Sequence, residues 1–409
     1  MAIIIPFKAL RPEVQYAKQV ASPPYDVLNS KEAKILAQGN PASFLHITKS
    51  EIDLPENIDI HTEEVYKKAK ENLDAFLNRN ILFVETKPCY YIYRLVMSSI
   101  EQTGLVCCSS IDDYENDIIK KHELTRPEKE LDRITHIKTT GAQTGNVFLA
   151  YNNVDEIDEI VDGWKKERSA IYNFTADDLI EHTIWLINDE VVIKKITDIF
   201  KDKVSCTYIA DGHHRAASAA KVRSLQAKVS EDGNYFLTTL FPANQLRILD
   251  YNRVVKDLNG KNNDEFLLNL EREFTISKKE AAYLPDRPRC FGLYLDKQWY
   301  RLELRHPEKI REEDSIASLD ISILEEEILK PILGINDQRT DTRIDFVGGI
   351  RGLAELEKRV DSGEMAVAIS LFPVSIDQLF KVADSGQVMP PKSTWFEPKL
   401  RDGLLTHLI

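Results

Sequence analysis

Residues 204–222 read Val-Ser-Cys-Thr-Tyr-Ile-Ala-Asp-Gly-His-His-Arg-Ala-Ala-Ser-Ala-Ala-Lys-Val, and this stretch decides how the chain is interpreted. A β-type run over 204–210 stops at Asp211 and Gly212, and an alanine-rich helical run begins at Ala216. The junction predicts a strand, a tight turn and a helix whose first backbone N–H groups have no partner within the helix. The helix dipole adds positive potential at the same place. The sequence therefore predicts an anion-binding turn, and phosphate is the anion that suits it best.

The side chains of this turn fit the same interpretation. Gly212 lets the backbone approach a ligand closely, and Arg215 presents a planar fork of donors that matches phosphate oxygens. His213 and His214 are adjacent on the helix and point in different directions, so the pair does not predict one metal site. The simpler alternative is that Asp211 is an ordinary helix N-cap beside two surface histidines. Five such residues at one junction favour the anion site.

Composition limits the classes of partner. The chain has 409 residues, which predicts two or three domains. Its formal net charge is −13 with Lys and Arg dispersed among acids, so we expect no nucleic-acid partner and no anionic membrane partner. No apolar run is long enough to cross a membrane, and the apolar stretch 1–6 lacks the marks of a signal peptide. Five cysteines without the paired spacing of a zinc site predict free thiols in a cytoplasmic protein.

Helical and β-type segments alternate without a regular β-α-β rhythm, which predicts an α+β fold. Before residue 260 we expect strands at 2–5, 146–151, 182–187 and 235–241, a hairpin over 89–111 that turns at 101–104, and helices at 61–80, 153–168 and 190–202. After it we expect helices near 264–273, 318–330 and 375–384, a hairpin at 290–304 and a buried strand at 365–372. We therefore predict a catalytic region over 1–260, with a split near 150–175 as an alternative, and an α+β C-terminal region over 261–409.

A second polar cluster covers residues 121–133 and combines acids, bases and a histidine within a few helical turns. Glu123 is a candidate general base, because a carboxylate near a substrate hydroxyl can accept its proton. The candidate phosphate or nucleotide contacts in the cluster are Lys121, His122 and Arg133. The alternative is a solvated helix face whose charges pair only with one another.

Two shorter segments add candidates. Residues 22–26, Ser-Pro-Pro-Tyr-Asp, form a rigid turn that places Tyr25 and Asp26 together, either to contact substrate or as a structural corner. Residues 392–399 read Lys-Ser-Thr-Trp-Phe-Glu-Pro-Lys and could clamp a phosphate, or could form a C-terminal arm anchored by its aromatic rings. The phosphate-binding candidates there are Lys392, Ser393 and Thr394. No Walker loop, HExxH or GxSxG motif is present.

Taken together, several of these segments resemble the domain-of-unknown-function 1015 family of bacteria and archaea. They are Ser-Pro-Pro-Tyr-Asp-Val at 22–27, Lys-His-Glu-Leu-Thr at 121–125, Asp-Arg at 132–133, Ile-Ala-Asp-Gly-His-His-Arg at 209–215, Arg-Val-Val at 253–255 and Met-Pro-Pro-Lys-Ser-Thr-Trp-Phe at 389–396. The resemblance extends over nearly the whole chain. The family name by itself implies no mechanism.

The turn also resembles the Asp-Gly-x-His-Arg motif of free serine kinases with the ParB/sulfiredoxin-like fold. Asp211, Gly212, His214 and Arg215 match the motif position by position, and His213 occupies its variable place. The resemblance implies a nucleotide-binding core with mixed sheets, ATP as co-substrate, a catalytic aspartate near Mg²⁺, and phosphate held by the histidine and arginine. Those kinases use a separate glutamate as base, a role for which Glu123 is our candidate here.

We therefore predict a small-molecule kinase that transfers a phosphoryl group from ATP, or another phosphate donor, to the hydroxyl of free L-serine, giving O-phosphoserine. On this hypothesis, Arg215→Ala abolishes activity in a protein that stays folded. One alternative is a nucleotide-binding regulatory protein of the ParB type without kinase activity. Another is a sulfiredoxin-like reductase, which would need a reactive thiol, whereas Cys206 is expected to be buried in a strand. A phosphotransferase acting on another small metabolite fits equally well, and the oligomeric state is not indicated.

Overall fold

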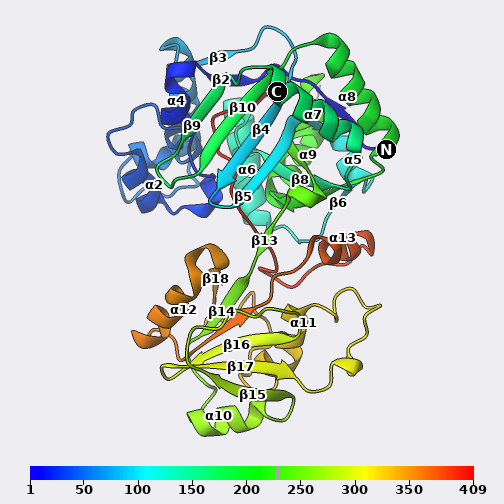
Figure 1. Cartoon of the computed structure of the whole chain (residues 1–409). Coiled ribbons are helices and arrows are strands. Elements are labelled where there is room, and N and C mark those ends of the chain that lie inside the picture. Colours follow the sequence, from blue (N-terminus) through cyan, green and yellow to red (C-terminus); the bar gives the residue numbers. More distant parts are fainter. Residues whose placement is uncertain (226–229) are drawn as a thin grey trace. The chain divides into compact units, whose positions relative to one another are not determined.

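The chain divides into two units in the computed structural model, which describes residues 1–225 and 230–409 (Figure 1). The first unit contains residues 1–246 and 398–409, and the second contains residues 247–397. The sequence predicted a boundary after residue 260 and a C-terminal region over 261–409. In the structure the last twelve residues, 398–409, instead lie in the first unit.

A mixed sheet forms the centre of the first unit. Its strands follow the order β6 (Ile119–Lys120), β11 (Thr207–Asp211), β8 (Val147–Tyr151), β12 (Tyr235–Pro242), β5 (Ile100–Ser110), β4 (Tyr90–Met97), β10 (Glu181–Ile187) and β9 (Tyr172–Thr175), with β1 (Ile4–Ile5) beside β5. The pairs β6–β11 and β8–β12 are parallel, and the other pairs are antiparallel. The pairing of β11 with β8 shifts register between Ile209 and Asp211, directly before the turn that the sequence singled out.

Helices cover this sheet and a smaller antiparallel sheet formed by β2 (Leu10–Pro12) and β3 (Leu82–Val84) (Figure 1). The helices of the first unit are α1 (Ala17–Val20), α2 (Ser30–Ala37), α3 (Leu45–Thr48), α4 (Glu63–Asn78), α5 (Ile111–Glu115), α6 (Pro127–Thr140), α7 (Asp155–Glu167), α8 (Glu190–Lys203) and α9 (His213–Leu225). Local signals set their ends. Asn29 and Glu32 form a capping box on α2, Pro127 occupies the first turn of α6, and Gly141 ends that helix with a φ of +68°.

The alanine-rich face of α9 packs on the sheet. Ala216, Ala219 and Ala220 are buried in the same core as strand residues such as Leu149 and Ile209. Small side chains let the helix lie close to the strands, which keeps the start of α9 next to the end of β11. Helix α9 also packs against α6, where Val222 contributes to a small apolar cluster. These two helices therefore position most of the candidate site.

The C-terminal segment joins the first unit through short backbone pairings. Strand β21 (His407–Leu408) pairs with β7 (Ala142–Gln143), and isolated bridges connect Asp402 to Ser22 and Thr406 to Leu10. Leu400, Leu404 and Leu405 are buried. Such short pairings leave no periodic pattern in the sequence. The sequence therefore could not predict that residues 398–409 belong to the first unit.

The second unit is built on an antiparallel sheet. Its order is β15 (Phe274–Lys279), β17 (Gln298–Leu304), β16 (Cys290–Leu295), β19 (Val367–Leu371), β14 (Tyr251–Val255) and β18 (Ile344–Gly348), and β13 (Ile248–Leu249) pairs with β20 (Trp395–Phe396). Its helices are α10 (Asn263–Leu270), α11 (Asp320–Leu324), α12 (Gly352–Asp361) and α13 (Ile376–Asp384). The two units together confirm the predicted α+β class. No helix in the described ranges is long and apolar enough to cross a membrane.

The first predicted hairpin is right in kind but wrong at its turn. The chain reverses at Ser98 and Ser99, between β4 and β5, and Ser98 has a φ of +54°. Gly104, which suggested a turn at 101–104, instead lies within β5. A Cβ at Gly104 would be 2.7 Å from Thr239 Cγ2 and 2.8 Å from a ring carbon of Phe241. This glycine is therefore explained by close packing against β12 rather than by a turn.

Candidate functional site

The turn between β11 and α9 has the geometry of an anion-binding helix start. Gly212 has a φ of +101°, a region that residues with side chains rarely adopt. A Cβ there would lie 3.1 Å from Arg215 Cζ and 3.4 Å from Val147 Cα. The helical hydrogen bonds begin with Ala216 N donating to Gly212 O at 3.0 Å, so the N–H groups before Ala216 have no partner inside the helix. Helix α9 begins three residues earlier than the sequence predicted.

Gly212→Ala should destabilise the protein by about 1–3 kcal/mol, because it forces a side chain into a strained conformation and against Arg215. Urea unfolding of the two proteins measures the change. Gly163→Ala is the matched control, since Gly163 lies within α7 and a Cβ there meets no atom within 4 Å. That control should be stabilised by about 0.5–1 kcal/mol, as expected for alanine in a helix. Equal midpoints for Gly212→Ala and the wild type would contradict the assigned turn.

Asp211, the last residue of β11, is held between two cations. Its Oδ2 accepts a hydrogen bond from Lys399 Nζ at 2.8 Å, and its Oδ1 lies 3.3 Å from Arg215 Nη2. Burial by itself would raise the pKa of Asp211. Lys399 and Arg215 outweigh that effect and hold the pKa below its usual value. Asp211 is therefore ionised at neutral pH.

Arg215 is anchored from three directions. Its side chain is only 8 % exposed; Nη1 donates to Asn146 O, and Nη2 lies 3.2 Å from Asp26 Oδ2 as well as near Asp211. Burial lowers the pKa of Arg215, but Asp26 and Asp211 raise it by more. The guanidinium is thus a fixed cation that links the turn to residues 25–27, the short 3₁₀ helix η2. The structure brings together the predicted Asp211, Arg215 and Asp26.

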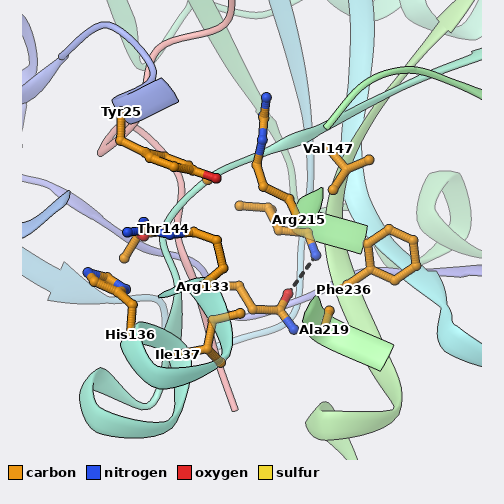
Figure 2. Close-up of a pocket in the computed structure, with 12 residues that line it drawn as sticks. Tyr25, Arg133, His136, Ile137, Thr144, Val147, Arg215, Ala219 and Phe236 are labelled. Carbon is orange, nitrogen blue, oxygen red and sulfur yellow. Dashed lines mark hydrogen bonds between the residues drawn. The ribbon is translucent and has the colours of Figure 1, made fainter. Parts of the chain in front are cut away.

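Tyr25 and Arg133 lie on the other side of Arg215. The guanidinium of Arg133 stacks 3.9 Å from the centre of the Tyr25 ring, and its Nη2 lies 2.7 Å from Asp132 Oδ2. Figure 2 shows Tyr25, Arg133 and Arg215 among the residues that line one small cavity. Arg133 was predicted as a phosphate ligand and Tyr25 as a substrate contact. The structure places both in this cavity wall.

Two residues of the C-terminal segment belong to the site but were not among the predicted residues. Lys399 contacts Asp211, and Asp402 Oδ2 accepts a hydrogen bond from Tyr25 N at 3.3 Å. Burial raises the pKa of Asp402 to about 7, against the opposing effect of Arg215. The only sequence signal for either was that Lys399 is the last residue of the segment 392–399, which was considered as a phosphate clamp.

His122, His213 and Glu123 form a group beside the helix start. The rings of His122 and His213 meet edge to face with centres 4.6 Å apart, and His122 N donates to His213 Nε2 at 3.4 Å. His213 Nδ1 lies 3.6 Å from Glu123 Oε2. Burial lowers the pKa of His122 to about 4 and that of His213 well below its usual value. Both imidazoles are therefore neutral at pH 7, and the His213 Nδ1–H points toward Glu123.

The other predicted residues have contacts of their own. His214 Nε2 accepts a hydrogen bond from Arg126 N at 2.9 Å. Lys121 Nζ lies 4.4 Å from the Tyr114 ring centre and 3.7 Å from Asp117. Lys392, Ser393 and Thr394 lie in the second unit, where Lys392 Nζ is 5.8 Å from the Tyr251 ring centre and Ser393 donates to Pro390 O. The phosphate-binding role of these five residues stays a prediction.

The structure also bears on the metal and thiol chemistry that the sequence suggested. Within 1–225 and 230–409, no group of three or more His, Cys, Asp or Glu side chains is arranged to hold a metal ion by itself. Asp211 remains the candidate Mg²⁺ contact, with Lys399 and Arg215 on its oxygens. Cys206 precedes β11 and is only half-buried, so the expectation of a buried strand thiol is wrong. Its Sγ lies 3.3 Å from the Tyr208 hydroxyl.

The turn, the ion-paired aspartate and the fixed arginine thus come together at one place on an α+β fold. A comparison with family profiles matches residues 4–322 to the family described as protein of unknown function (DUF1015). The chain therefore belongs to the DUF1015 family, as its sequence motifs predicted. No curated protein sequence matches the chain.

Solved structures give distant matches. Free serine kinase in complex with AMP shares 12 % identity and a TM-score of 0.34, over 74 % of this chain and 92 % of that chain. SbnI with a C-terminal truncation from Staphylococcus aureus shares 10 % identity and a TM-score of 0.38, over 73 % and 85 %. A conserved hypothetical protein from Pyrococcus furiosus shares 12 % identity and a TM-score of 0.34, over 74 % and 94 %. At these TM-scores the function has to be argued from the site itself.

Proposed function

We propose that the first unit binds a nucleotide and transfers a phosphoryl group from it to the hydroxyl of a small acceptor, with free L-serine as the leading candidate. The observation that carries this proposal is the convergence of the α9 helix start, Arg215 and Lys399 on the Asp211 carboxylate. Phosphoryl transfer depends mainly on positioning and on stabilising charge at the phosphoryl oxygens. Helix N–H groups and two cations at one turn supply both.

The two cations have different roles in this proposal. Arg215 is fixed by Asp26 and Asn146, so it would hold phosphate oxygens in one orientation. Lys399 carries its charge on a flexible side chain that contacts Asp211, and it would follow the phosphoryl group as charge develops. Glu123 lies near the start of α9, where its carboxylate is 3.6 Å from His213 Nδ1. In this position it would accept the proton of the acceptor hydroxyl. In this scheme Asp211 orients the cations.

Charge balance supports a role for Mg²⁺. Asp211 and Asp26 already pair with Arg215 and Lys399, so these four side chains have no net charge. A nucleotide would add several negative charges at the same turn. Mg²⁺ in nucleotide sites is commonly held by one or two carboxylates together with substrate phosphates, and Asp211 can provide such a carboxylate. When bound, the ion would neutralise and orient the phosphates.

³¹P NMR of the purified protein with Mg²⁺, ATP and L-serine tests the proposal. We expect a phosphomonoester resonance that grows only when serine is present, with ADP as donor in a parallel sample. Lys221→Met, which removes an exposed lysine of α9, is the matched control and should keep full activity.

The binding of nucleotide, measured by calorimetry, separates the remaining outcomes. Tight binding without any phosphorylated product would favour the nucleotide-binding regulatory alternative. Absence of both binding and product would contradict the proposed function.

A further inference from the structure

The cavity beside the turn is small and has an unusual lining. Its volume is about 20 Å³, which is room for one or two water molecules. Two arginines, Arg133 and Arg215, line it together with apolar side chains (Figure 2), and both arginines are more than nine-tenths buried. The apolar part of the lining consists of Ile137, Val147, Ala219, Phe236 and Leu237. The cavity cannot hold a nucleoside, but a carboxylate group fits this size.

Arg133 offers an unused donor in this cavity. Asp132 Oδ2 accepts from Nε at 2.9 Å and lies 2.7 Å from Nη2, and the Tyr25 ring covers one face of the guanidinium. Nη1 is buried and has no hydrogen-bond partner among the residues that the structure describes. Buried N–H groups are nearly always paired, because leaving one unpaired is costly. The unpaired Nη1 of Arg133 therefore indicates that a bound ligand supplies a hydrogen-bond acceptor here.

Two other polar side chains of the lining, Gln143 and His136, are already engaged. Gln143 accepts from Leu237 N at 2.8 Å and donates to Tyr235 O at 3.2 Å. His136 Nε2 lies 3.0 Å from Ile47 O, and burial lowers its pKa to about 4, so it is neutral. Recognition in the cavity thus depends on the two arginines. Both Nη atoms of Arg215 are taken by Asn146, Asp26 and Asp211, which leaves only its buried Nε unpaired among the described residues, whereas Arg133 offers a whole Nη1 group.

The chemistry of the lining selects among anions. A guanidinium edge binds the oxygens of a carboxylate or a phosphate. A doubly charged phosphate would lose much of its hydration against the apolar side of the cavity, and Asp132 already neutralises one charge of Arg133. A singly charged carboxylate loses less. Because Arg215 lines this cavity and also contacts Asp211, a group bound here lies next to the phosphoryl site.

We propose that the cavity between Tyr25, Arg133 and Arg215 binds the carboxylate of the acceptor, which makes the acceptor a small hydroxy acid or hydroxy amino acid. This inference rests on the proposed phosphotransferase function and replaces phosphate by carboxylate as the partner predicted for Arg133. Arg133 is then a specificity-determining residue, while Arg215 and Lys399 serve the phosphoryl group.

Matched pairs of ligands test the assignment directly. L-serine and glycerate carry the carboxylate, whereas serinol and glycerol replace it with a hydroxymethyl group. Binding is measured by calorimetry in the presence of a non-hydrolysable ATP analogue. We expect at least one of the two acids to bind roughly ten- to a hundredfold more tightly than its alcohol. Arg133→Met should remove that preference and leave the affinity for the ATP analogue unchanged.

Two further variants keep the test decisive. Lys138→Met removes an exposed charge from the same helix, α6, and should keep the preference. Arg133→Met could fail to fold because it leaves Asp132 unpaired. In that case the double variant Asp132→Asn/Arg133→Met, which removes both charges of the pair, is assayed in place of the single variant.

The outcomes separate this inference from the proposed function. Equal binding of acids and alcohols, or no binding of either acid, overturns the carboxylate subsite even if serine is phosphorylated. If Arg133→Met lowers the affinity for the ATP analogue but not the affinity for the acid, the carboxylate subsite is also overturned. Arg133 would then be a ligand of the nucleotide phosphates, as the sequence first predicted. Arg133-dependent binding of an acid without any phosphorylated product supports the subsite while the proposed function fails.

Discussion

Asp211→Asn is expected to lower kcat by roughly 10²–10⁴-fold while nucleotide affinity stays equal to that of the wild type or increases. The carboxylate of Asp211 holds Lys399 at 2.8 Å and contacts Arg215, so it fixes both cations where phosphate oxygens would be stabilised. The amide keeps the shape of the side chain but not its charge. The nucleotide phosphates would then bind a more positive site. Lys399 and Arg215, however, would no longer be held in place by a carboxylate, and the carboxylate contact to Mg²⁺ would be lost.

Steady-state kinetics and calorimetry together check this prediction. The first gives kcat for serine phosphorylation, and the second gives Kd for a non-hydrolysable ATP analogue. Asp198→Asn, which removes an exposed carboxylate that pairs with Lys194 on α8, is the control and should change neither value. A kcat equal to that of the wild type would remove Asp211 from catalysis. A loss confined to nucleotide affinity would make it a binding residue instead.

The centre of the site could be predicted because its signals are local. Within a few residues, Asp211, Gly212 and Arg215 follow a β-type run and precede an alanine-rich run, and each has a conformational or chemical reason to be there. The positive φ of Gly212 confirms the expected turn. The polar cluster that holds Glu123 and Arg133 was found from composition, but their different positions beside the turn follow from the packing of α6 on α9.

The rest of the site depends on long-range packing that no local pattern encodes. Lys399 is separated from Asp211 by 188 positions, and Asp402 reaches Tyr25 only because the chain returns to the first unit after residue 397. The neutral state of His122 and His213 is a consequence of burial, which the identity of the two residues does not indicate by itself. The C-terminal segment was therefore predicted as a separate phosphate clamp rather than as a source of partners for Asp211.

Arg215→Ala is expected to lower the free energy of unfolding by about 3–5 kcal/mol, in addition to abolishing activity. The sequence alone suggested a variant that stays folded. In the structure, however, the guanidinium is buried and neutralises Asp211 and Asp26 while it donates to Asn146 O. Its removal leaves the Asp211 carboxylate with one cation fewer in a site where burial disfavours its charge. Urea unfolding at pH 7 measures the loss, and Asp211→Asn in the Arg215→Ala background should recover part of it, because the pair is coupled.

Arg223→Ala is the matched control for this prediction. Arg223 lies on the same helix and also pairs with two carboxylates, Asp112 and Glu115, but both are largely exposed. Its removal should cost no more than about 1 kcal/mol. Similar losses for the two arginine variants would show that the buried pairing of Arg215 carries no special stability.

The pH dependence of the Arg215→Ala effect follows from the same contacts. In the folded wild type the pKa of Asp211 lies below its ordinary value of 3.8, so its ion pairs stabilise the fold above that pH. This contribution is lost as the pH falls below 3.8 toward the folded pKa. The stability difference between wild type and variant should therefore be largest near neutral pH and shrink in acid. A stability difference that is constant from pH 7 to pH 3 would mean that Arg215 stabilises the fold by packing rather than by its charge. The role of Arg215 as a fixed cation of the site would then be contradicted.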